Sequence, residues 1–170
     1  MKALVYFLAL LWAGSLFAQQ QGYVKAKVNP GRAGVFIDGK YVGPAANFRT
    51  ARKYSVSPGE HELKLVEPRY EEITTKVDVK AGKTAVVSET MKALPVPKGP
   101  FGRLRAESVD KFAAVYVNNK FYGHADEFSN SSQGLLLPPG EYEVRIEPTA
   151  GGSAVTKKVT LEANKTVVVK

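Results

Sequence analysis

The chain has 170 residues, of which 44% are hydrophobic and 24% charged, and it contains no cysteine. This composition excludes a disordered or fibrous protein and fits one ordinary domain or two small ones. Without cysteine there can be no disulfide framework, thiolate metal site or cysteine nucleophile, so packing must hold the fold together.

The first 18 residues have the pattern of a secretory signal peptide. Lys2 precedes a short apolar run over residues 3–13, and Ala18 is a small residue at the expected cleavage site. This run is shorter than a typical transmembrane helix, and no second apolar run follows it. We therefore expect residues 1–18 to be removed and the mature chain to be exported, to the periplasm or the cell surface, without a transmembrane anchor.

The positive charge lies mainly in the first half of the mature chain. Residues 19–98 contain 14 basic and 8 acidic side chains, whereas residues 99–170 contain 9 and 8. In an exported protein such an excess favours anionic envelope polymers, lipid headgroups or acidic proteins over nucleic acid as partners, although a basic solubilising surface would look the same. An acidic partner should prefer the first half.

The chain contains an internal repeat with an offset of about 80 residues. Three blocks match in the same order: residues 34–43 with 114–123, residues 58–65 with 139–146, and residues 76–84 with 158–166. Between the two copies, residues 94–100 form a spacer with three prolines, which should be stiff because each ring fixes its own φ. The order and the offset indicate a duplication.

Each copy is expected to consist of β-strands. Residues 23–28 alternate apolar and basic side chains, and no mature segment keeps a helical apolar repeat for three turns. Two pairs, Asp38 with Gly39 and Asn118 with Asn119, consist of residues that tolerate the positive φ of a type I′ hairpin turn. We predict about six or seven short strands per copy, folded as an antiparallel β-sandwich.

The first copy resembles the PEGA domain, a small surface module of bacteria and archaea. The resemblance is carried by Pro30 with Ala33, by the block at residues 35–40, by Pro58 with the Gly-Glu-His that follows, and by Tyr70. It implies two small immunoglobulin-like or transthyretin-like sandwiches: residues 19–92, a linker at 93–100, and a more diverged copy at 101–170. It also implies an accessory envelope module without catalytic residues or a cofactor.

Histidines and carboxylates offer little for catalysis or metal binding. His61 lies in an expected strand and is replaced by Tyr142 in the second copy, so a packing or surface role is expected. His124 lies beside Asp126 and Glu127, but a metal there would need further ligands from elsewhere. We predict a non-catalytic protein without a metal or other cofactor.

Four aromatic residues form the first candidate site. If Asp38 and Gly39 make a two-residue turn, Phe36 faces Tyr41 across the hairpin, and Tyr116 faces Phe121 in the second copy. The alternate positions of both hairpins are also apolar, yet a sandwich strand usually buries only one face. Either the rings pack in a core or across strands, or they form an exposed platform on which sugars could stack.

A basic loop forms the second candidate site. Arg49, Arg52 and Lys53 follow Phe48, whereas the matching loop of the second copy, after Gly123, is acidic and polar around Phe128. The shared phenylalanine should anchor each loop on its core, while the divergent residues face solvent. The three cations are either merely solvated or contact phosphate or carboxylate groups of an envelope glycan.

Taken together, these features predict a non-catalytic, exported binding or adaptor protein of the bacterial cell envelope. Its partner would be an envelope polysaccharide, such as an anionic glycan, or a surface or periplasmic protein. The alternative is a structural subunit whose last strand, at residues 166–170, ends at an open sheet edge and pairs with another chain.

Overall fold

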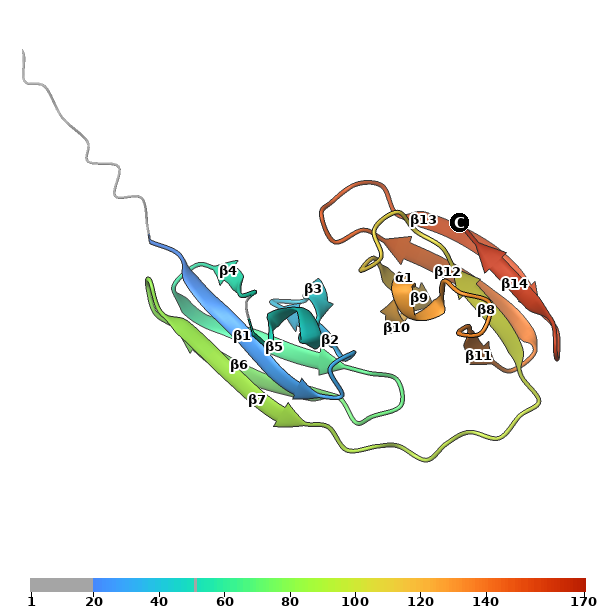
Figure 1. Ribbon diagram of the computed structural model, residues 1–170, viewed down its shortest axis with the longest axis horizontal. Coiled ribbons are helices and arrows are strands. Elements are labelled where there is room, and N and C mark those ends of the chain that lie inside the picture. Colours follow the sequence, from blue (N-terminus) through green and yellow to red (C-terminus); the bar gives the residue numbers. More distant parts are fainter. Residues whose placement is uncertain (1–19, 51) are drawn as a thin grey trace, which may run out of the picture.

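The computed structural model describes residues 20–50 and 52–170. The predicted signal peptide, residues 1–18, lies outside the described residues. Two groups of strands, here called the first and second units, lie side by side and are joined by an extended segment that runs along one side of both (Figure 1). The prediction of an all-β fold of two small sandwiches is confirmed.

Each unit contains seven strands. Those of the first unit are β1 (Gly22–Asn29), β2 (Gly34–Ile37), β3 (Lys40–Pro44), β4 (Tyr54–Val56), β5 (Gly59–Val66), β6 (Ile73–Val79) and β7 (Thr84–Thr90). Those of the second unit are β8 (Gly102–Ala106), β9 (Ala114–Val117), β10 (Lys120–His124), β11 (Leu135–Leu137), β12 (Gly140–Glu147), β13 (Val155–Leu161) and β14 (Thr166–Val169). The 3-10 helix η1 (Ala45–Phe48) and the helical turn α1 (Ala125–Phe128) follow β3 and β10.

The two units have the same sheet topology. The first unit pairs its strands in the orders β4-β1-β7 and β3-β2-β5-β6, and the second in the orders β11-β8-β14 and β10-β9-β12-β13. Pairing is antiparallel except for β1 with β7 and β8 with β14, which run parallel. The sequence did not predict these parallel pairs, because alternation of side chains identifies a strand and does not give its direction.

Each unit has its own hydrophobic core between its two sheets. Leu63 and Leu65 of β5 are fully buried in the first, and Leu104 and Val144 in the second. The alternation along β1, in which every second side chain is buried, is what a strand with one core-facing side requires. Phe48 and Phe128 are buried at the ends of η1 and α1, which confirms them as anchors beneath their loops.

The hairpin turns follow the predicted chemistry. Asp38 and Gly39 both have positive φ, as do Asn118 and Asn119, and the flanking residues pair across a two-residue loop. The hairpins β2-β3 and β9-β10 therefore share one register, in which Phe36 pairs with Tyr41 and Tyr116 with Phe121. No helix within residues 20–50 and 52–170 is long and apolar enough to cross a membrane.

Candidate functional site at the junction of the two units

The outer faces of the two hairpins pack against each other. Tyr41 is 7% exposed and Phe121 is 5% exposed, and they form a third hydrophobic cluster with Val66 and Ala114. The ring centroids of Tyr41 and Phe121 lie 5.1 Å apart. This packing explains why both faces of each hairpin are apolar: one closes its own sandwich, and the other covers the neighbouring unit.

A glycine makes room for this contact. A Cβ atom added to Gly34 would lie 2.6 Å from the ring of Phe121, which is closer than real Cβ contacts allow. The equivalent position in the second unit is Ala114, which is fully buried in the same cluster. The duplicated hairpins are therefore not interchangeable, because the first provides the notch into which the ring of the second fits.

Polar groups also gather at the junction. The hydroxyl of Tyr41 is buried and has no hydrogen-bond partner within residues 20–50 and 52–170. Burial raises the pKa of Tyr41, and the carboxylate of Glu127 in the second unit adds to the rise. Arg69 of the first unit reaches toward Glu127, with Nη2 at 3.9 Å from Oε2. Apart from these groups the junction is built from the apolar cluster, and the ion pair at its edge is weak.

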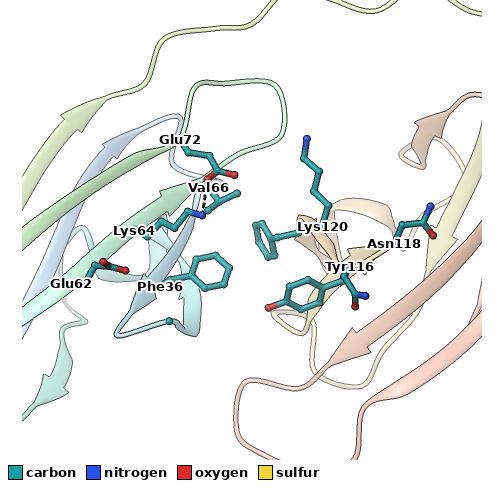
Figure 2. A pocket seen from close by; sticks show the side chains of 11 residues that line it. Phe36, Glu62, Lys64, Val66, Glu72, Tyr116, Asn118 and Lys120 are labelled. Atoms are coloured by element: carbon teal, nitrogen blue, oxygen red, sulfur yellow. Dashed lines mark ion pairs between the residues drawn. The ribbon is translucent and has the colours of Figure 1, made fainter.

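A groove of about 510 Å³ opens beside the packed rings, between the outer faces of the four-stranded sheets (Figure 2). Its volume is in the range of small-ligand clefts, about 300–1,000 Å³. The first unit lines it with Phe36, Gly39, Glu62, Lys64, Val66 and Glu72, and the second with Tyr116, Asn118, Asn119, Lys120 and Phe121. Both copies of the duplication are needed to build it.

The wall of the groove near Gly39 is held by a histidine. His61 Nδ1 lies 2.7 Å from Asp38 Oδ2, and its Nε2 lies 2.8 Å from the carbonyl oxygen of Ser57. The hydrogen bond with Asp38 raises the pKa of His61, burial opposes this rise, and the Ser57 carbonyl adds to it. The same bond lowers the pKa of Asp38, whose Oδ1 also accepts the backbone N–H of Glu62 at 3.0 Å. The expected structural role of His61 is therefore confirmed.

The four candidate rings do not share one environment. Tyr41 and Phe121 are buried in the junction, so packing across the units accounts for both of them. Phe36 and Tyr116 are only half-buried and line the groove. An open platform of four rings is absent from this arrangement, and the pair that still reaches solvent faces a groove, as Figure 2 shows.

The cations of the basic loop do not converge. Lys53 Nζ lies 3.3 Å above the ring centroid of Tyr23, near the start of β1, whereas Arg49 lines a shallow depression with Lys27, near the end of that strand. Tyr23 and Lys27 are separated by roughly 13 Å along an extended chain. Arg52 is exposed. A single phosphate group cannot bridge these positions, and their role as a contact for a polyanion stays a prediction.

The loop after β10 brings together only part of the set considered for metal binding. His124 Nδ1 lies 2.8 Å from Glu127 Oε1, while Asp126 is exposed. Within residues 20–50 and 52–170, no group of three or more potential ligands is arranged to hold a metal ion. His124 instead ends β10 directly before the turn α1, and its backbone N–H lies 3.4 Å from Oε1 of Glu127 in that turn.

Comparison with known proteins supports the fold of the first unit. Residues 22–94 match the PEGA domain family, and this range contains all of β1 to β7. The first unit is therefore a PEGA domain. The match ends at residue 94. Membership of the second unit stays a prediction, supported by its identical strand order.

Comparisons with solved structures and with curated proteins say less about this chain. A solved structure titled "The Bacillus anthracis TIE protein" is similar at 15% identity and a TM-score of 0.27, and the similarity covers 89% of this chain and 34% of that one. This chain thus spans about a third of that protein, and so distant a likeness supports no conclusion about function. No curated protein matches.

Sequence reasoning missed several groove residues. Lys64 is half-buried, Glu72 and Lys120 are exposed, and none of the three belongs to a motif that indicates binding. The one available signal was the second apolar face of each hairpin, because two such faces in one chain can cover each other. That signal predicts a contact between the units, but it does not give the angle that leaves a groove open beside the contact.

Proposed function

We propose that this chain is a non-catalytic, exported binding or adaptor protein of the bacterial cell envelope, and that the groove between its units holds the partner. The groove itself carries the proposal, because two half-buried rings and several charged side chains from both units face one opening. Clefts at the contact of two domains are a common place for ligands. The PEGA match and the signal-peptide pattern support an envelope location.

Retention on envelope material tests this proposal. We expect the purified mature chain to sediment with isolated cell envelopes. Glycan digestion of the envelopes should release it if the partner is a polysaccharide, and protease treatment should release it if the partner is a protein. A salt series separates a contact of the basic loop from one of the groove, because exposed charges are screened. Changing Arg49, Arg52 and Lys53 to Ser should reduce only the salt-sensitive part. No retention on any envelope fraction would refute the proposal.

A second function is favoured by the free edge of β14. This strand pairs with β8 on one side only, and Val168 on it is 39% exposed. A strand edge of this kind can pair with another chain. Trimming the strand would also remove Val169, which is fully buried, so Val168→Lys is the sharper variant. Sedimentation that rises with concentration, and that this variant abolishes, would support assembly, whereas a monomer at every concentration would refute it.

A further inference from the structure

The groove has an apolar floor built from aromatic rings of both units. Phe36 and Tyr116 are half-buried and project toward the opening (Figure 2). Phe36 packs edge-on against Phe121 with centroids 5.2 Å apart, and the Arg145 guanidinium covers Tyr116 at 4.0 Å from its centroid. These contacts hold the rings in fixed orientations. A ligand therefore meets ring surface that loses little freedom when it binds.

The rim of the groove offers both donors and acceptors. On the first unit, Lys64 Nζ lies 2.7 Å from Glu72 Oε2. On the second unit, Lys120 forms no ion pair within residues 20–50 and 52–170, and Asn118 uses only its Oδ1, which accepts the N–H of Glu143 at 2.9 Å. The charges of Lys64, Lys120, Glu62 and Glu72 balance. This rim suits a ligand with many hydroxyl or amide groups better than a polyanion.

The strands that carry Phe36 and Tyr116, β2 and β9, offer no free edge to an extended peptide. β2 lies between β3 and β5, and β9 lies between β10 and β12, so both strands that carry the rings already have neighbours on each side. A peptide that adds a strand to a sheet needs a free edge. On β2 and β9, recognition must therefore come from ring faces and side chains. Sugars require this combination, because a pyranose has an apolar C–H face and a polar rim.

We propose that the groove binds an oligosaccharide of pyranose units, stacked on Tyr116 and Phe36 and hydrogen-bonded through its hydroxyls to Lys120, Asn118 and the Lys64–Glu72 pair. This inference deepens the proposed function and depends on it. The two can nevertheless fail separately, because a protein partner would satisfy the proposed function without any sugar in the groove.

Titration of the ¹⁵N-labelled mature chain with three soluble probes tests the inference: cellotetraose, chitotetraose and tetragalacturonate. We expect at least one neutral probe to shift the amide signals of Gly39, Asn118 and Asn119. Tyr116→Leu keeps an apolar side chain at the junction but removes the ring, and it should weaken binding about fivefold or more. Unchanged signals of Leu104 and Leu161, core residues on strands that do not pair with β9, would show that this variant still folds.

Lys120 provides a matched pair of variants. Lys40 occupies the same turn position in the first unit, is exposed, and does not line the groove. Lys120→Ala should weaken sugar binding about threefold, whereas Lys40→Ala should leave it unchanged. Shifts confined to residues outside the groove, no shifts with any probe, or equal binding by Tyr116→Leu would overturn the inference. If Tyr116→Leu is still retained on envelopes like the wild type, the proposed function stands and the sugar site does not.

Discussion

The two units use the same hydrogen bonds with different chemistry. In the first, His61 Nε2 lies 2.8 Å from the Ser57 carbonyl, and in the second the Tyr142 hydroxyl donates to the Pro138 carbonyl at the same distance. Asn118 likewise takes the place of Asp38, each accepting a backbone N–H from the neighbouring strand. The difference is that His61 is also bonded to Asp38. The duplication thus kept the geometry, and only the first unit has at this point a side chain that titrates near neutral pH.

A second pair of loops shows the same pattern. In the first unit the buried carboxylate of Glu67, 3% exposed, accepts hydrogen bonds from Arg32 at 3.1 Å and from the Arg69 side chain and backbone. In the second unit the acid lies on the opposite loop, where Asp110 accepts from the backbone and hydroxyl of Thr149 at 2.7 and 2.8 Å. The residue types of these connections differ between the two units. What the units share is a carboxylate that connects the two loops.

The largest expected effect concerns the separation of the two cores. Leu63→Ala removes a fully buried side chain from the first core and should lower the free energy of unfolding of that unit by about 3 kcal/mol. Urea unfolding followed by amide signals of each unit measures this. Because the cores are separate clusters, signals of the second unit should shift much less. An equal loss in both units would show that they unfold as one.

The second prediction breaks the asymmetry of the junction. Gly34→Ala gives the first unit the residue that the second has at this position, and its methyl group would meet Phe121. We expect a cost of about 1–3 kcal/mol at the junction rather than in either core. Small-angle scattering should show a larger radius of gyration. Gly31→Ala is the control, since its new Cβ comes no closer than 3.4 Å to Ala46. Identical scattering from both variants would contradict the role of the notch.

The third prediction compares the two loop connections. Glu67→Gln removes the charge that faces two guanidinium groups and should cost about 2 kcal/mol, whereas Asp110→Asn should cost about 1 kcal/mol because its partners are neutral. Urea unfolding of both variants measures the difference. Burial raises the pKa of Asp110, but hydrogen bonds from Thr149 and Phe112 outweigh it and leave the pKa lowered. This contribution is therefore lost as pH falls through the lowered pKa, and Asp110→Asn should remove that acid sensitivity.

The smallest expected effect is a pH dependence confined to the first unit. Because the pKa of folded His61 lies above its ordinary 6.5, its contribution is complete below that value and is lost as pH rises through the raised pKa. The contribution of Asp38, whose pKa is lowered from 3.8, is lost as pH falls through that lowered pKa. Unfolding measured between about pH 5.5 and 8.5 should show the first unit weakening relative to the second.

A double variant checks the origin of this dependence. Asp38→Asn combined with His61→Tyr gives the first unit the side chains of the second, with the bond to Ser57 preserved. The pH dependence of the first unit over that range should then disappear while its fold remains. If the stability of the first unit does not change with pH in the wild type, the His61–Asp38 bond makes no pH-dependent contribution. If the stability still changes with pH in the double variant, the dependence has another source.

Much of the fold could be predicted from the sequence because it depends on local patterns. Alternation along β1 and the positive-φ residues at the two hairpin turns are local features of the chain. The internal repeat is found by direct comparison of segments. The parallel pairing of β7 with β1 could not be predicted, since it depends on strands that meet from opposite ends of a unit. The ion pair of Glu67 with Arg32 was equally hidden, because these two residues lie 35 positions apart on separate loops.

The sequence by itself determined the two all-β units, their turns and the anchoring of Phe48 and Phe128, because side-chain periodicity and backbone preference fix them locally. Only the tertiary structure decided what the second apolar face of each hairpin does. The notch at Gly34 and the ring of Phe121 are 87 positions apart in the chain. Their fit buries Tyr41 and leaves Phe36 and Tyr116 at the edge of a groove, because packing between distant surfaces depends on shape.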